Sequence, residues 1–433
     1  MDTGNSRYCT AGPRHRAALA RLESGGFDLI TRNVRLALTI LPTLLAGYAI
    51  AEAVRFARAE QLAREDTVEA LQGALRLTPG NADYYARIAT LDPSRDDQLR
   101  VALALNPTDP SRWIMLSVRQ EEEGDAAGAE QSLRRANQVC RYFTPRWSLA
   151  AFYYRHGNQA GFIQWARLAL ASGSGQTESL FQMAQRLGLP SSRILQELVP
   201  DLPASLDAYL HLVLRQGKVE DAYAAAAQLM RIGSRESSNS ILETSESLFA
   251  AGKIDPAVDL WNTAIRLRWV AGSPLDPASG RSLANGSFAG EPLERGFDWK
   301  TSLPSGVSAS LSAPDRSLSL VFSGRQPENC ELMSQFVPLL PGRHYQIKVR
   351  YRLPSLGSAS GLQWSVLPLP SGKPLMMGML EGSGGEFVEH SFAFETAHEQ
   401  GPLRIALAYN RLPGTVRLEG EFRIQSVQLT LLP

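Results

Sequence analysis

The chain has 433 residues, of which 44% are apolar and 20% are charged, and its 44 basic and 43 acidic residues leave a net charge of +1. A chain of this length exceeds what one hydrophobic core supports, so two or more domains are expected. The balanced charge argues against a nucleic-acid-binding surface, which normally has a basic excess.

The first predicted element is an apolar helix over residues 34–54. Its centre, Leu36 to Ala51, has 16 residues without a charge, slightly fewer than the roughly 20 that span a bilayer. Arginines outnumber acidic residues before it, which predicts a single-pass membrane anchor with residues 1–33 in the cytoplasm and the following domains outside. A cleaved signal peptide, with Ala49-Ile50-Ala51 as the cleavage site, and a buried helix of the repeat region are the alternatives.

A repeat follows, marked by glycines at nearly constant intervals: Gly124, Gly157, Gly188, Gly217 and Gly252. Five, nine and twelve residues after four of them lie mostly small or apolar residues, an offset that places them on one face of a helix. This register resembles the tetratricopeptide repeat, although the closing proline of each unit is missing and the Gly188 unit lacks the alanines. We expect about six helix pairs over residues 65–271, forming an α-solenoid.

The resemblance implies a concave face, lined by the first helix of each pair, that binds a protein segment. It places Tyr154, Arg155, His211, Leu214 and Arg215 near that groove. The alternative for each is an ordinary solvated or inter-helix position.

After a linker over residues 272–284, apolar and polar residues alternate at period two, which is typical of strands. Strands are expected at 307–311, 317–322, 332–337, 344–352, 362–367, 375–380, 386–394, 403–409 and 416–431. Many short strands separated by turns predict an antiparallel two-sheet sandwich over residues 285–433.

The runs Asn285-Gly286-Ser287-Phe288 and Leu340-Pro341-Gly342-Arg343-His344-Tyr345, with the Gly-Phe-Asp-Trp segment that ends at Trp299, resemble a jelly-roll carbohydrate-binding module. The resemblance implies a glycan site, for which aromatic rings and polar side chains are needed. Trp299, Arg350 and Gln363 are the candidates, whereas Trp364 and Tyr409 alternate in phase with core residues. A structural or protein-binding sandwich, with Trp299 as a buried plug, is the alternative.

The sequence contains no HExxH motif, phosphate-binding loop or GxSxG elbow, so we expect no metal, no cofactor and no enzymatic activity. The cysteines at 9, 140 and 330 form no CxxC pair and are expected to be free, with a Cys140–Cys330 disulfide as the alternative in an oxidising compartment.

The order of segments resembles proteins encoded with bacterial exopolysaccharide machinery. It predicts an adaptor in the bacterial inner membrane, with repeats and sandwich in the periplasm. The repeats would bind a protein, and the sandwich a polysaccharide or a second protein. A structural assembly factor without glycan binding and a glycan-active enzyme are the alternatives.

Overall fold

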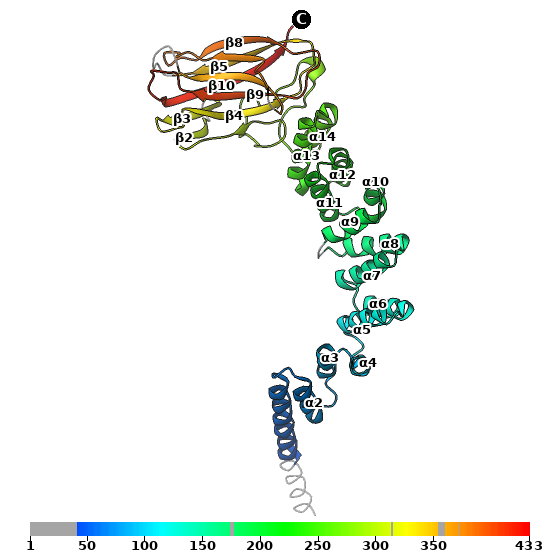
Figure 1. Cartoon of the computed structure of the whole chain (residues 1–433). Helices are drawn as coiled ribbons and strands as arrows, with labels where there is room; N and C mark the ends of the chain where they lie inside the picture. The colour runs from blue at the N-terminus through cyan, green and yellow to red at the C-terminus, as the bar shows by residue number, and fades with distance from the viewer. Residues whose placement is uncertain (1–40, 174–176, 313–314, 354–359, 371) are drawn as a thin grey trace, which may run out of the picture. The chain divides into compact units, whose positions relative to one another are not determined.

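The computed structural model describes residues 41–173, 177–312, 315–353, 360–370 and 372–433. The chain divides into two compact units, residues 1–141 and 142–433. The expected cytoplasmic segment, Cys9 and residues 34–40 of the apolar segment lie outside the described residues. The boundary between the units falls within the repeats, so the second unit contains both the last repeats and the sandwich (Figure 1).

The described part of the first unit is helical. Residues 41–63 form one helix. It is followed by α2 (Val68–Leu77), α3 (Ala82–Leu91), α4 (Asp96–Leu105), α5 (Pro110–Glu122) and α6 (Ala126–Val139).

The helix over residues 41–63 has two different halves. In its first half, large apolar side chains are 60–67% exposed: Leu41, Leu44, Leu45, Tyr48 and Ile50. In its second half, Ala59 and Ala63 pack with α2 and α3 in a common core. The expectation of a buried repeat helix is therefore wrong for the first half. No helix among the described residues is both long and apolar enough to cross a membrane.

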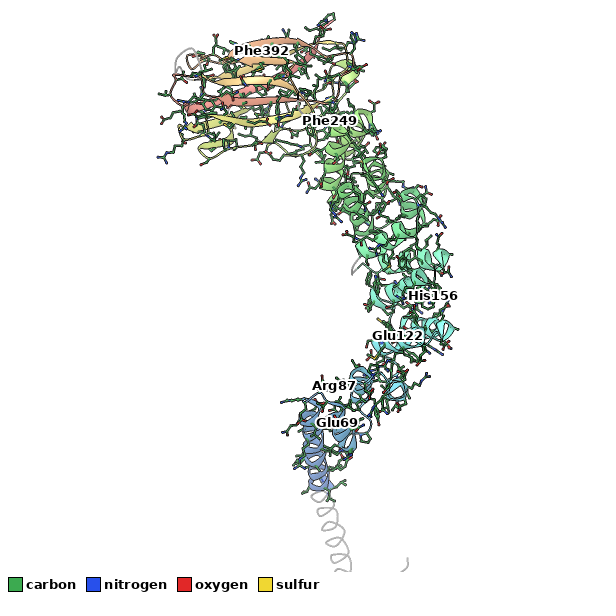
Figure 2. All side chains as sticks on the ribbon, in the orientation of Figure 1. Glu69, Arg87, Glu122, His156, Phe249 and Phe392 are labelled. Carbon is green, nitrogen blue, oxygen red and sulfur yellow. The ribbon has the colours of Figure 1, made fainter. Side chains whose placement is uncertain are left out.

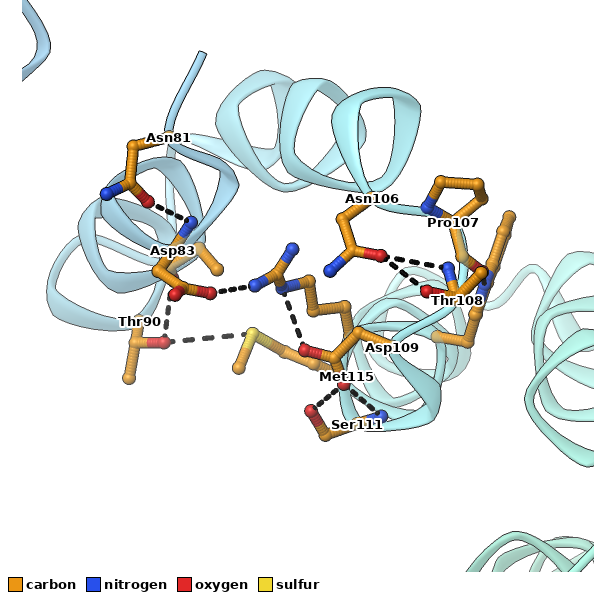
Figure 3. Close-up of polar contacts among 12 residues, drawn as sticks. Asn81, Asp83, Thr90, Asn106, Pro107, Thr108, Asp109, Ser111 and Met115 are labelled. Atoms are coloured by element: carbon orange, nitrogen blue, oxygen red, sulfur yellow. Dashed lines mark hydrogen bonds and ion pairs between the residues drawn. The ribbon is translucent and has the colours of Figure 1, made fainter. Parts of the chain in front are cut away.

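Capping residues explain where the first repeat helices begin. The Asn81 side chain accepts a hydrogen bond from the Asp83 N–H at 2.9 Å and begins α3, and Asp109 accepts from the Ser111 N–H at 2.9 Å and begins α5 (Figure 3). Such side-chain acceptors satisfy N–H groups that the first helical turn leaves unpaired. The segments 78–81 (Thr-Pro-Gly-Asn) and 106–109 (Asn-Pro-Thr-Asp) are thus turns that each end in the cap of the next helix.

The second unit begins with the remaining repeats. Their elements are α7 (Phe143–Arg155), α8 (Gln159–Leu170), α9 (Thr177–Arg186), α10 (Ser191–Arg193), a π-helical turn η1 (Ile194–Leu198), α11 (Pro203–Arg215), α12 (Val219–Ile232), η2 (Arg235–Ser237), α13 (Ser238–Ala250) and α14 (Ile254–Arg266).

The glycine repeat has a conformational cause. All five glycines follow the first helix of a pair and have left-handed φ values between +67° and +85°. No atom lies within 4 Å of a Cβ built on any of them, so backbone conformation rather than space selects glycine. The expected register is confirmed, because all twelve positions at the three offsets are buried: Ala129, Leu133, Ala136, Phe162, Ala166, Ala169, Ala222, Ala226, Leu229, Ala257, Trp261 and Ala264.

The Gly188 unit departs from the others as its missing alanines indicated. Its second helix is reduced to α10 and η1, which together span Ser191–Leu198. Pro190 precedes this element and Pro200 follows it, and proline cannot continue a helical hydrogen-bond ladder. The unit still contributes Leu195 and Leu198 to the interior.

The sandwich consists of two antiparallel five-stranded sheets, ordered β1-β4-β9-β6-β7 and β2-β3-β10-β5-β8. The strands are β1 (Lys300–Thr301), β2 (Val307–Ser312), β3 (Ser317–Ser323), β4 (Asn329–Val337), β5 (His344–Arg352), β6 (Leu362–Pro368), β7 (Met376–Met379), β8 (Val388–Glu395), β9 (Leu403–Asn410) and β10 (Glu419–Leu431). A short 3₁₀ turn, η3 (Pro277–Ser279), precedes them. The nine predicted strands are confirmed, and among the described residues the two-residue β1 is the one strand that the sequence did not predict.

Candidate functional site

The expected groove residues lie on the first helices of successive pairs. Helices α7, α9, α11 and α13 contact one another in that order. Arg215 on α11 forms an ion pair with Glu178 on α9 at 2.9 Å. His211 on α11 lies 3.3 Å from the Ser240 hydroxyl on α13 and 3.4 Å from the carboxylate of Asp207. Both residues therefore also join neighbouring repeats.

The other two expected groove residues lie on α7. The ring of Tyr154 is 6.2 Å from that of Phe162 on α8, and Tyr154 is half-buried while Arg155 is exposed. Tyr154 thus contributes to the contact between the two helices of its own pair.

The glycine register identifies which residues are equivalent on each first helix. Ten, six and three residues before the glycine lie on one helix face. On α9 these residues are Glu178, Gln182 and Gln185, on α11 they are Asp207, His211 and Leu214, and on α13 they are Leu242, Glu246 and Phe249. All six residues on α9 and α11 are exposed or half-buried, whereas Phe249 is fully buried and Leu242 is 4% exposed.

The sandwich is what buries this face of α13 (Figure 2). The ring of Phe249 stacks on Phe336 with centroids 5.2 Å apart and meets Phe297 edge-on at 5.1 Å. Phe297 also meets Trp261 on α14 at 6.0 Å. Aromatic pairs at such distances add to the stabilisation from burial alone. We call Phe249, Trp261, Phe297 and Phe336 the junction cluster.

A carboxylate fixes the junction beside these rings. Glu246 accepts a hydrogen bond from the backbone N–H of Gly296. It also forms an ion pair with the Lys300 ammonium at 2.6 Å. The ammonium also lies 4.5 Å from the centre of the Phe336 ring, a favourable cation–π distance. Gly296 has φ +65°, and an added Cβ would lie 2.7 Å from the Trp261 ring, so glycine is required here for both conformation and space.

The expected glycan residues do not form one site. Trp299 is 0% exposed, stacks on Phe288 with centroids 5.9 Å apart and donates its indole N–H to the Asn285 carbonyl at 3.2 Å. Arg350 lies on the outer face of β5, and Gln363 lies on the outer face of β6, which belongs to the other sheet.

The Trp299 ring therefore cannot serve as an exposed surface on which a sugar stacks. The alternative prediction, that this ring is buried, is correct. The physical reason is that the Trp299 ring packs against Phe288 and Trp364 and belongs to the hydrophobic core of the sandwich. Every Trp and Tyr side chain of residues 285–433 is buried: Trp299, Tyr345, Tyr351, Trp364 and Tyr409. The sandwich thus offers no Trp or Tyr ring at its surface on which a pyranose could stack.

A cavity of about 360 Å³ lies beside the junction, between α14 and the loop before β1. Its wall includes Trp261, Asn285, Ser287, Glu291 and Asp298. Burial raises the pKa of Asp298, although its carboxylate accepts hydrogen bonds from the backbone N–H groups of Trp299 and Leu293. The wall carries the carboxylates of Glu291 and Asp298 and no basic side chain, so it disfavours an anionic ligand.

The structure also shows the state of the cysteines and of the residue types that bind metals. Cys140 and Cys330 are free thiols. In the described part of the chain, no group of three His, Cys, Asp or Glu side chains has a metal-binding arrangement.

No protein-family model matches the chain, and no curated protein matches it. A solved structure described as "CBM4 structure and function" is 11% identical, with a TM-score of 0.28, covering 35% of this chain and 100% of that chain. The CBM22-1 xylan-binding domain of Paenibacillus barcinonensis Xyn10C is 14% identical, with a TM-score of 0.24, covering 34% and 91%. Pseudomonas aeruginosa PilF is 15% identical, with a TM-score of 0.24, covering 51% and 93%. Likeness this weak carries no argument about the function of this chain.

Proposed function

We propose that this protein is a non-enzymatic adaptor whose repeats bind a segment of a protein partner along the accessible face of α9 and α11. One observation carries the proposal. The equivalent face of α13 already holds a peptide segment, Gly296–Lys300, through aromatic contacts, an ion pair and a backbone hydrogen bond. The same face on α9 and α11 keeps polar and apolar side chains accessible to a ligand.

A photo-crosslinking residue tests this assignment. Gln182 is exposed on the groove face of α9, and Ala224 is exposed on the second helix α12. In cells of the source organism, a crosslinker at Gln182 should give a discrete product with another protein, and one at Ala224 should not. Equal products from both positions would show that contact is non-specific and contradict the proposal.

We further propose that residues 34–54 anchor the protein in a bacterial inner membrane, with the N-terminus in the cytoplasm and the repeats and sandwich in the periplasm. The proposal is supported by the arginine excess before the segment and by the exposed apolar side chains of residues 41–50. An alkaline phosphatase fusion after residue 66 should be active, and a cytoplasmic signal would contradict this topology.

The structure also determines where an anchor deletion should end. Glu60 accepts a hydrogen bond from the Tyr84 hydroxyl at 2.5 Å, and Ala59 and Ala63 belong to the core of the first repeats. A chain that starts at residue 55 should therefore be soluble and folded. A chain that starts at residue 64 should lose structure in α2 and α3.

Binding of a secreted polysaccharide is the second candidate function, and the junction cavity is the observation that favours it. With every Trp and Tyr of the sandwich buried, such binding would depend on hydrogen bonds to Asn285, Ser287 and Glu291. The resemblance to exopolysaccharide-associated proteins makes the polysaccharide of the source organism the first ligand to test. Affinity electrophoresis of the chain from residue 55, compared with its Glu291→Ala variant, should show retardation that the substitution removes. Equal mobility with and without polysaccharide would leave the sandwich a structural and protein-binding domain.

A further inference from the structure

The four edge strands of the two described sheets differ in how they are protected against pairing with another chain. An exposed strand edge presents unpaired N–H and C=O groups, and proteins usually block it with charge, proline or shortness. Strand β1 has two residues and lies beside the ion pair of Lys300, and β7 has four residues. Strand β8 presents the exposed carboxylates of Glu389 and Glu395.

Strand β2 has none of these protections along its length. Within the residues that the structure describes, it pairs only with β3 and forms the edge of its sheet (Figure 1). Its six residues, Val-Ser-Ala-Ser-Leu-Ser, carry no charge, and the flanking stretch from residue 301 to 314 carries none either. An edge strand without charge or proline lacks the features by which proteins usually prevent another strand from pairing with it.

The hydrogen-bond pattern shows which residues of β2 are available. The Ser323 N–H donates to the Gly306 carbonyl at 2.9 Å, and the strands pair with Val307 opposite Phe322. In an antiparallel ladder, hydrogen-bonded pairs alternate with non-bonded pairs. Ser308, Ser310 and Ser312 therefore bond to β3, whereas the backbone groups of Ala309 and Leu311 point to the open edge.

We propose that β2 pairs with β2 of a second copy of this chain, antiparallel and about a twofold axis through Ser310. In this register Ala309 of each copy exchanges two hydrogen bonds with Leu311 of the other, and the two five-stranded sheets join into one. A twofold interface uses the same surface on both copies, so the strand must be complementary to itself.

The side chains of β2 meet that condition. On the inner side, Ala309 lies opposite Leu311 of the other copy, so a small side chain faces a large one in both pairs. On the outer side, Ser310 faces Ser310, and Ser308 faces Ser312, whose hydroxyl donates to Asp315 and can still accept from Ser308. No like charges meet, which is the reason that a second copy fits better than it would at β8, where glutamates would face one another.

Proline substitution tests the proposal on the chain that starts at residue 55 and on the full-length chain in detergent. Ala309→Pro removes an N–H that points to the open edge of β2 and leaves the ladder with β3 intact. Ala393→Pro is the matched control. The Thr396 N–H donates to the Arg343 carbonyl, and every second residue before Thr396 likewise bonds to β5, so the Ala393 N–H lies at the open edge of β8. Sedimentation velocity over a range of concentrations measures the monomer–dimer equilibrium, and circular dichroism checks that each variant is folded.

We expect the wild type and Ala393→Pro to dimerise with the same dissociation constant and Ala309→Pro to be monomeric, with a loss of at least tenfold in affinity. Ser310→Lys provides an independent test, because it places two ammonium groups on the axis and should weaken the dimer in a way that added salt reverses. A monomeric wild type, or a dimer that survives both β2 substitutions, would overturn the proposal. If the chain is monomeric and β2 crosslinks to a different protein, the dimer proposal is wrong, and a strand of that protein pairs with β2 instead.

Discussion

Truncating Phe297 should weaken the contact between the last repeat and the sandwich and destabilise α13 and α14, while the sandwich stays folded. Phe297 is 1% exposed and contacts Phe249 and Trp261 at centroid distances of 5.1 and 6.0 Å, but it does not belong to the core of the sandwich. Phe→Ala substitutions at buried sites cost about 3–5 kcal/mol. Here the loss falls on the contact between α13–α14 and the loop before β1.

Hydrogen exchange with mass spectrometry resolves where that free energy is lost. At 1.4 kcal/mol for each factor of ten, the amides of α13 and α14 in Phe297→Ala should exchange about 10²–10⁴ times faster than in the wild type. The strands β5, β9 and β10 should keep their protection. Phe322→Ala is the matched control, because Phe322 is 2% exposed inside the sandwich core and should destabilise the strands instead. The reasoning is refuted if α13 and α14 lose less than about tenfold in protection in Phe297→Ala, or lose equally in both variants.

Three further predictions concern the core and the outer face of the sandwich and the packing of the repeats. Trp299→Ala should lower the free energy of unfolding by about 3–5 kcal/mol in urea titrations, since the ring is wholly buried; an unchanged midpoint would mean that the ring is not part of the core. Ala226→Leu should cost about 1–3 kcal/mol, because Ala226 is 0% exposed and its helix has no room for three more carbons, whereas Ala224→Leu on the exposed side of α12 should be nearly neutral. Hydrogen bonds from Ser312 and Ser317 and the ion pair with Arg423 lower the pKa of Asp315 to about 2. Because this folded pKa lies below the unfolded value, the stabilisation is present above about pH 4 and is lost as the pH falls to about 2. The difference in urea midpoint between the wild type and Asp315→Asn should therefore be constant at pH 5–6 and shrink towards pH 2, and a constant difference down to pH 2 would contradict the assignment.

The periodicity of the sequence alone predicted most of the helices and strands. The glycine interval and the offsets behind it predicted the helix pairs, because left-handed turns and close helix packing impose both locally. Alternation predicted which side of β5 is buried, with Ile347 and Val349 inside and Lys348 outside. The order of the strands within each sheet could not be predicted from the sequence, since it depends on pairing between distant segments. For that reason Arg350 and Gln363 were grouped as candidates for one glycan site, although they lie on different sheets.

The junction cluster was missed for a related reason. A phenylalanine on an amphipathic helix is expected in the core of its own repeat, and nothing local distinguishes Phe249 from such a residue. One irregularity did point to the contact. Trp261 occupies the position that alanine holds in two other units, at Ala166 and Ala226, and a residue that large at a small-residue position needs space provided by another segment.

The burial of the α13 face by the sandwich constrains how the gene can evolve. Repeat proteins commonly change length by duplicating or losing whole units, and the inner pairs of this array can be copied without touching the sandwich. The last pair cannot be copied in the same way, because only one copy of Glu246, Phe249 and Trp261 can meet the single Gly296–Lys300 segment. The surplus copy would leave two large aromatic side chains exposed to water. Changes in repeat number should therefore occur upstream of α13, while the final pair and the sandwich are inherited together.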